Sequence, residues 1–136
     1  MKIAFAQGKD AAATLADNGR GDAIVIEAWG VDGVVEKVPM ADSPTKLLLS
    51  HQNVDGPFTF AVRLSPFDTV DEAAAYFAQE AARQGIQDRV TIENGAGAVI
   101  AIMDDALLQS VHRVAWKSVD LTIRYTFAIT TITTST

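Results

Sequence analysis

The sequence predicts an α+β domain: a mainly antiparallel β-sheet of about eight strands with one helix packed on it. Two observations predict the sheet. Apolar and polar residues alternate from Leu121 onward and again through 57–64, which is the period of strands with one buried face. The helix is predicted at about 70–84, where apolar residues recur at helical spacing.

Composition indicates a single folded domain spanning 1–136. The chain is 49% apolar, which suits one hydrophobic core, and it has no cysteine, which excludes disulfides and thiolate metal sites. The net charge is −6, and the basic residues form no stripe along the sequence. Binding of nucleic acid through its phosphates is therefore disfavoured, and we expect no nucleic-acid partner.

The first half of the chain predicts short strands separated by turns. Residues 10–18 are ambiguous, because they suit either a short helix capped by Asp10 and ended by Gly19 or an irregular arm. The remaining prediction is strands at 2–7, 23–29, 34–38, 46–51 and 57–64, turns at 31–34 and 53–56, and a loop at 39–44.

The helix carries the clearest start signal in the sequence. Thr69 followed by Glu72 forms a capping box, and Gly85 supplies a stop at the C-terminal end. We expect the buried stripe of this helix to consist of Val70, Ala73, Ala74, Phe77 and Ala81.

After the helix, the pattern again predicts strands. The expected elements are strands at 90–93, 98–103 and 110–117, turns at 94–97 and 118–120, and a turn or single helical turn at 104–109. A long strand then runs from Leu121 toward Thr134.

The terminal strand is too long for a compact domain of this size. At about 3.3 Å per residue, 121–134 would extend about 45 Å, against an expected radius of gyration of about 14 Å. Either the strand bends at a bulge, or its Thr-rich end leaves the domain as an arm that another chain can pair with. Residues 130–136 are therefore a candidate C-terminal arm, and residues 1–18 a candidate N-terminal arm.

No motif predicts a catalytic, cofactor or metal site. Arg20-Gly21-Asp22 matches an adhesion tripeptide but is better explained as a surface turn. Residues 94–97 carry a G-x-G followed by a β run, which indicates a hairpin turn and not a phosphate cradle. His51 and His112 have no partners at metal-ligand spacing, and the Asp104-Asp105 pair fits a turn or cap better than an acid–base pair.

The leading hypothesis is a structural, self-assembling protein and not an enzyme. In composition and strand layout the sequence resembles small capsid, decoration and tail proteins of bacteriophages, which are often acidic, cysteine-free and β-rich. The expected partners are further copies of the chain and other virion proteins, joined by exchanged or added strands. The expected interface residues are Arg124, Tyr125, Thr126, Ala128, Thr130, Thr131, Ile132, Thr133, Thr134, Trp29 and Trp116.

Two other functions remain open. The first is a small enzyme or ligand-binding domain with a pocket between the helix and the sheet, where Tyr76, His51, His112 and Trp116 are the residues of interest. The second is an acidic adaptor or inhibitor of a host protein. We expect a virion or cytoplasmic location without a membrane partner, because the sequence shows no signal peptide and no apolar run long enough to cross a bilayer.

Overall fold

The computed structural model describes residues 1–6, 12–29, 52–53, 57–64, 66–114 and 119–134. These residues contain one α-helix, α3 (Val70–Ala81), and one short 3-10 helix, η1 (Asn18–Arg20). The strands are β1 (Lys2–Phe5), β2 (Ala13–Asp17), β3 (Ala23–Trp29), β4 (Gln52–Asn53), β5 (Pro57–Arg63), β6 (Gln87–Glu93), β7 (Val99–Arg113), β8 (Thr122–Ala128) and β9 (Thr131–Thr134).

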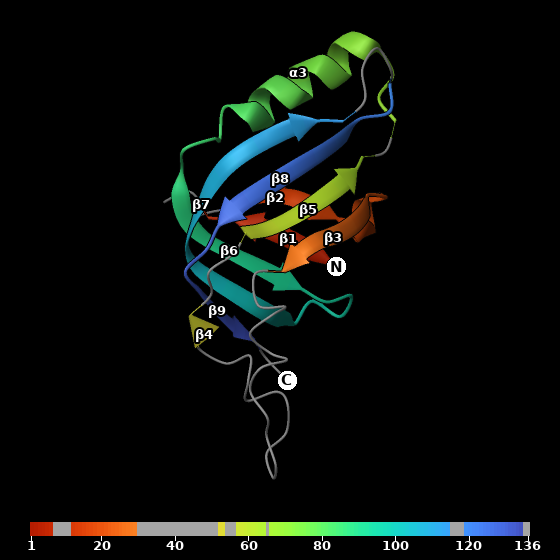
Figure 1. The fold of residues 1–136 in the computed structure, drawn as a ribbon. Coiled ribbons are helices and arrows are strands. Elements are labelled where there is room, and N and C mark those ends of the chain that lie inside the picture. Colours follow the sequence, from red (N-terminus) through yellow and green to blue (C-terminus); the bar gives the residue numbers. More distant parts are fainter. Residues whose placement is uncertain (7–11, 30–51, 54–56, 65, 115–118, 135–136) are drawn as a thin grey trace.

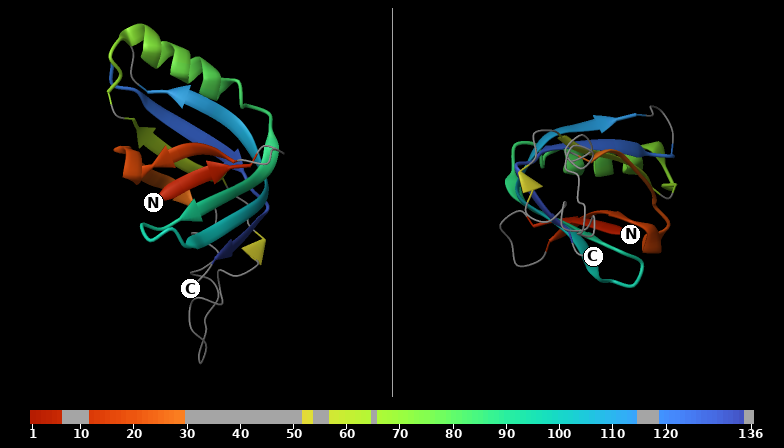
Figure 2. Two further views of the ribbon diagram at one scale, coloured as in Figure 1. Left: turned by 180° about the vertical axis from the view of Figure 1, so that it is seen from behind. Right: turned by 60° about the horizontal axis from the view of Figure 1, so that its bottom comes forward.

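The strands form one strongly curled antiparallel sheet in the order β2-β1-β6-β7-β8-β5-β3. β9 lies off this path and pairs with β7 and β4. The sheet bends round until its two end strands, β2 and β3, come into contact beside η1, and α3 lies across one end (Figures 1 and 2). The predicted class, a mainly antiparallel sheet with one helix, is confirmed.

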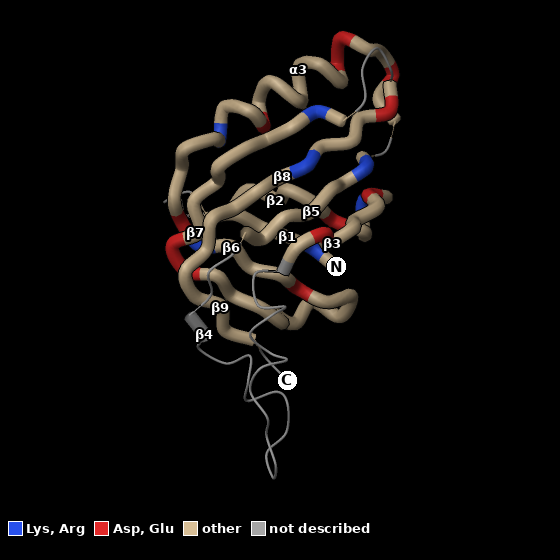
Figure 3. Tube along the Cα trace, in the orientation of Figure 1, with Lys and Arg blue, Asp and Glu red and all other residues tan. Residues whose placement is uncertain are grey.

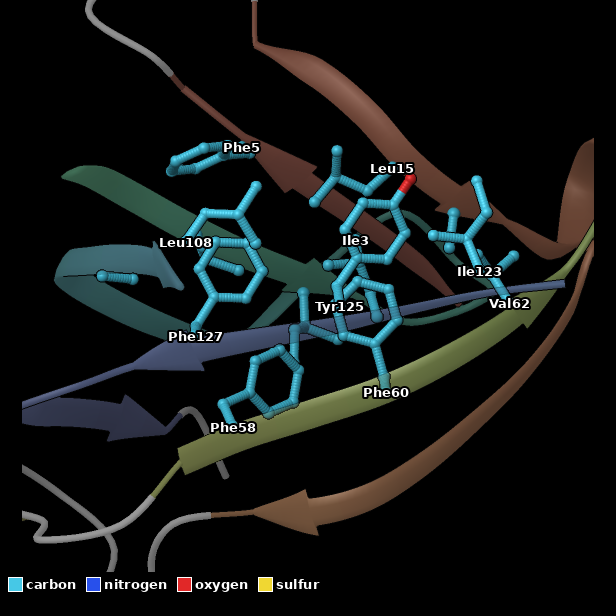
Figure 4. Close-up of a cluster of buried hydrophobic side chains, with 14 of the residues drawn as sticks. Ile3, Phe5, Leu15, Phe58, Phe60, Val62, Leu108, Ile123, Tyr125 and Phe127 are labelled. Carbon is cyan, nitrogen blue, oxygen red and sulfur yellow. The ribbon is translucent and has the colours of Figure 1, made fainter. Parts of the chain in front are cut away.

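Aromatic side chains fill the inside of the curled sheet (Figure 4). The rings of Phe60 and Tyr125 stack with centroids 5.0 Å apart, and Phe5 meets Phe127 edge to face at 5.1 Å. Phe58 stacks on Phe127 from the neighbouring strand. The period-two alternation of β5 and β8 produces this arrangement, because every second residue of each strand points inward.

Helix α3 begins where the sequence predicts. The hydroxyl of Thr69 accepts a hydrogen bond from the backbone N–H of Glu72 at 3.1 Å. The helix ends at Ala81, earlier than the predicted 84, because 82–86 continue in tighter three-residue turns. Gly85 follows with φ of 89°, a left-handed conformation that glycine adopts without strain.

The buried face of α3 differs from the predicted stripe. Ala73 is fully buried, but Val70 is 42% exposed, and Glu80 is buried with only 2% exposure. A buried carboxylate on a helix face cannot be read from hydrophobic periodicity, because it depends on a partner in the sheet. That partner, Tyr125, is described below.

Residues 13–17 form a strand and not the predicted helix or irregular arm. Their alanines favour a helix locally, but β2 pairs with β1 and fully buries Leu15 and Ala16 in the core. Tertiary pairing overrides the local preference here. Residues 1–6 and 12–18 therefore contribute two strands of the protein's own sheet and do not extend as an arm.

The predicted break at 104–109 is also wrong, because β7 runs without interruption from Val99 to Arg113. The pairing with β6 shifts by one residue between Asp88 and Val90, so Asp104 and Asp105 together lie opposite Arg89. Asp105 takes φ of 56° to form this bulge. The two aspartates therefore mark a β-bulge within one long strand.

The terminal strand follows the first of its two predicted courses and bends. β8 ends at Ala128, the chain turns through Ile129 and Thr130, and β9 returns to the sheet. The last two residues of β9, Thr133 and Thr134, pair with Ile102 and Ala101 of β7. The end of the chain up to residue 134 therefore pairs internally and is not a free arm.

Several predicted elements lie outside the described residues. These are the turn at 31–34, the strands at 34–38 and 46–51, the loop at 39–44, and most of the turn at 53–56. The end of the predicted strand at 110–117 and the start of the turn at 118–120 also lie outside them.

Candidate functional site: the edge strand β3

β3 forms one end of the sheet order. It pairs with β5 on one side through Ala23–Arg63 to Trp29–Phe58, and no strand among the described residues pairs with its other side. An unpaired strand edge presents a row of backbone N–H and C=O groups that another strand can join. β3 is longer than β2, the strand at the opposite end of the sheet.

The outward face of β3 carries the most exposed large apolar side chain in the described part of the chain. Val25 is 61% exposed, whereas Ile24 and Ile26 on either side of it are half-buried and pack against the core. In the part of the chain that the structure describes, this valine therefore has little packing around it. This position is suited to an apolar contact with another molecule.

A bulge and an ion pair mark the second half of β3. The pairing with β5 shifts between Ile26 and Ala28, which leaves Glu27 unpaired in the ladder. Its carboxylate accepts two hydrogen bonds from Arg124 of β8, from Nε at 2.6 Å and from Nη2 at 3.0 Å. The guanidinium lowers the pKa of the Glu27 carboxyl, and the carboxylate raises the pKa of Arg124.

This ion pair crosses the outer surface of β5, so it fixes β3 to a strand with which it does not pair. Ahead of the bulge, the part of β3 whose outer edge no described strand joins is 23–26. Bulges and charges are the usual means by which edge strands limit uncontrolled pairing.

The predicted interface residues of β8 divide between the two faces of the sheet. Arg124, Thr126 and Ala128 are half-buried on the outer face, and Thr126 lies 3.5 Å from Thr59 between their hydroxyl oxygens. Tyr125 is different, because it is fully buried in the core and is not available for contact with another chain.

The predicted interface residues after β8 also have different surroundings. Thr130 is exposed at the bend, and Ile132 is fully buried. Thr131, Thr133 and Thr134 are half-buried in β9. Trp29 ends β3 and pairs through its backbone with Phe58, whereas the Trp29 side chain and the whole of Trp116 lie outside the described residues.

The Arg20-Gly21-Asp22 sequence forms the turn that sequence reasoning favoured. Gly21 has φ of 97°, and the Asp22 side chain is only 1% exposed. Its carboxylate accepts hydrogen bonds from the Arg20 Nε at 2.6 Å and from the Asp17 backbone N–H at 3.0 Å. An adhesion receptor needs an exposed aspartate, so this conformation does not present the tripeptide for recognition.

Residues 94–97 form the predicted hairpin turn between β6 and β7. The Asn94 side-chain oxygen accepts hydrogen bonds from the backbone N–H groups of Ala96 and Ala98, at 2.9 and 3.1 Å. Gly97 has φ of 85°, which suits the turn. The backbone N–H groups of Ala96 and Ala98 thus serve the turn itself.

A buried polar network joins helix α3 to the sheet. Tyr125 donates a hydrogen bond to one oxygen of Glu80 at 2.7 Å, and Arg83 donates to the other at 3.0 Å. Burial is the main cause that raises the pKa of Tyr125 far above its ordinary value, and the Glu80 carboxylate adds to it. This network positions the helix over the end of the sheet.

An open cavity of about 210 Å³ lies beside the first half of the helix. Of the residues predicted for a helix-side pocket, Tyr76 lines it, whereas His112 is exposed on β7 and does not. His51 and Trp116 lie outside the described residues. The cavity is lined by Arg20, Asp22, Leu64, Phe67 and Tyr76.

Charged residues are interspersed over the described part of the chain (Figure 3). Asp104 forms an ion pair with Arg89 at 2.8 Å, and no group of three or more potential metal ligands occurs among the described residues. Within that same part, no helix has the length and apolar character needed to cross a membrane.

Comparison with known proteins gives no match to a protein family, to a curated protein or to a solved structure. The site must therefore be judged from its own geometry. Sequence reasoning identified the strand at 23–29 but did not select Val25 or Glu27. The run of apolar residues at 23–29 predicts a strand, but the edge position of this strand depends on pairing between residues far apart in sequence.

Proposed function

We propose that this protein is a structural subunit that self-associates by antiparallel pairing of β3 with β3 of a second copy. The observation that carries the proposal is the edge at 23–26, with which no strand of the described residues pairs and whose outward Val25 is 61% exposed. Main-chain hydrogen bonds across the joint would provide affinity, and the side chains would fix the register.

The strand is self-complementary when the pairing is centred on Val25. Each Val25 then lies opposite the same residue of the second copy, and Ile24 lies opposite Ile26. Opposed residues of an antiparallel pair share one face of the sheet, so the two exposed valines would cover each other. Such a joint is isologous and gives a twofold dimer, the commonest oligomer symmetry.

The filled interior supports a structural role. Ligand-binding barrels leave the interior of the sheet open. Here that interior is filled by four fully buried side chains: Phe5, Phe58, Phe60 and Phe127. Burial of this kind contributes to the stability of the scaffold. The surface of such a scaffold is then the part available for interaction.

The class of assembly that we propose is a virus or bacteriophage particle, on the basis of composition and strand layout. A net charge of −6 would keep the free subunit soluble before assembly. Pairing of one short edge buries less than the roughly 1,000 Å² expected of a stable interface. Self-association through β3 alone is therefore expected to depend on concentration, with further contacts in a particle.

Sedimentation velocity over a wide concentration range tests the proposal. The natural chain should form a dimer that dissociates on dilution, whereas Val25→Lys should stay monomeric because two lysines would oppose each other across the joint. Val99→Lys is the matched control, because Val99 is 41% exposed but lies on β7, away from the joint. A natural chain that is monomeric throughout, or equal dimerisation of Val25→Lys, would refute the proposed joint.

A further inference from the structure

We infer that the cavity beside the start of helix α3 binds a small neutral molecule with one planar ring and one hydrogen-bond acceptor. The cavity has a volume of about 210 Å³ and opens to solvent. Its lining residues come from three places. Arg20 and Asp22 lie in and after η1, Leu64 and Phe67 lie between β5 and α3, and Tyr76 lies on α3. None of its lining residues belongs to β3, so the inference is independent of the proposed self-association.

The volume of the cavity suits a ligand with a single ring. An apolar cavity of about 150 Å³ is large enough to hold benzene. A space of about 210 Å³ therefore accommodates one ring and a substituent of a few atoms. Larger ligands would extend into solvent.

The apolar wall of the cavity is suited to a planar ring. The rings of Phe67 and Tyr76 lie with centroids 5.5 Å apart at an angle of 46°, and Leu64 is almost fully buried beside them. Offset and edge-to-face contacts with two aromatic rings favour an aromatic ligand over an aliphatic chain of equal volume.

The Tyr76 hydroxyl provides the polar contact. It accepts a hydrogen bond from Arg20 Nη2 at 3.3 Å, and no described residue accepts a hydrogen bond from it. The pKa of Tyr76 is raised, first by burial and then by the nearby Glu80 carboxylate, so the hydroxyl keeps its proton at neutral pH. A ligand oxygen at this position would therefore receive a hydrogen bond.

The charges at the cavity select a neutral ligand. The Arg20 guanidinium is already paired with the Asp22 carboxylate at 2.6 Å, and the backbone N–H of Asp17 donates a second hydrogen bond to that carboxylate. A charged ligand would lose its hydration without meeting an unbalanced opposite charge. A carbonyl or amide oxygen satisfies the Tyr76 hydroxyl without this cost.

Titration of the 15N-labelled protein with benzamide, followed by amide NMR shifts, tests the inference. We expect saturable shifts centred on Arg20, Leu64, Phe67 and Tyr76, with millimolar affinity. Tyr76→Phe should weaken binding about five-fold, the loss expected for one hydrogen bond, because the ring stays in place. Benzylammonium, which is charged and lacks an acceptor, should give no saturable shifts at these residues.

Tyr125→Phe is the matched control, because Tyr125 donates to Glu80 and does not line the cavity. This variant should bind benzamide as the natural chain does. The inference is overturned if benzamide gives no saturable shifts at the cavity, if Tyr76→Phe binds equally well, or if both tyrosine variants lose affinity to the same extent.

Discussion

The hydroxyl of Tyr125 donates a 2.7 Å hydrogen bond to the carboxylate of Glu80, inside the contact between helix and sheet. Tyr125 is fully buried and Glu80 is 2% exposed. A buried carboxylate must be satisfied by donors, and here they come from Tyr125 on β8 and from Arg83 in the turn after the helix. This contact joins the C-terminal end of α3 to β8.

The first prediction concerns loss of this hydrogen bond. Tyr125→Phe should lower the free energy of unfolding by about 1–3 kcal/mol, because the Glu80 carboxylate stays buried with one donor fewer. Urea denaturation measures the change. Tyr76→Phe is the control and should cost less, since Tyr76 is half-buried and its hydroxyl bonds to Arg20 at the surface. Equal costs for the two variants would contradict the importance of the buried bond.

The second prediction is a loss of stability in alkali. Burial raises the pKa of both Tyr125 and Tyr76 above their ordinary value of 10.0. The unfolded chain therefore releases these protons at lower pH than the folded chain does. The stability that the two protonated tyrosines contribute is complete below pH 10, and it is lost as the pH rises above about 10.

Denaturation midpoints between pH 8 and 12, with tyrosinate absorbance as a second signal, measure this loss. Tyr125→Phe should show a shallower decline, because it lacks the more strongly shifted group. An identical decline in the natural chain and this variant would contradict the assignment.

The third prediction concerns the bulge in β7. Asp105 has φ of 56°, which β-branched residues rarely adopt, so Asp105→Val should be less stable than Asp105→Gly by about 1–2 kcal/mol. Thermal unfolding measures the difference. His112→Val and His112→Gly are the controls on the same strand, at a position that pairs with Arg124, where φ is not positive and valine should be preferred. If the valine variant were less stable than the glycine variant at both positions, the result would count against the bulge.

Local patterns in the sequence predict much of the fold. The alternation through β5 and β8 predicts two strands and their buried faces, and Thr69 marks the start of the helix. Asn94 and Gly97 predict the turn between β6 and β7. Each of these signals lies within a few neighbouring residues, so pairing with distant strands does not alter it.

The features that were missed depend on distant partners. Residues 13–17 become a strand because β1 pairs with them, and Glu80 is buried because Tyr125 lies opposite. Asp105 forms a bulge because two residues of β7, Asp104 and Asp105, lie opposite the single residue Arg89 of β6. The candidate site was missed for the same reason, since Val25 is an edge residue only once the strand order is known.

The fourth prediction concerns the end of the chain. Ile132 is fully buried in β9, so Ile132→Ala should cost about 2–5 kcal/mol of stability. Thr133→Ala, at the half-buried neighbouring position, should change stability by less than about 1 kcal/mol. A chain that ends at Ile129 should likewise be destabilised. If the shortened chain kept its stability and lost only its self-association, β9 would be the joint in place of β3.

The central claim is that β3 pairs with itself around Val25, and cysteine cross-linking tests it most directly. The chain contains no cysteine, so Val25→Cys introduces a single thiol. Opposed residues of an antiparallel pair have Cα atoms about 4.5–5.5 Å apart, within the range that a disulfide spans. Under mild oxidation, Val25→Cys should become a covalent dimer much faster than the control Val99→Cys. Equally slow cross-linking of the two variants would contradict the account.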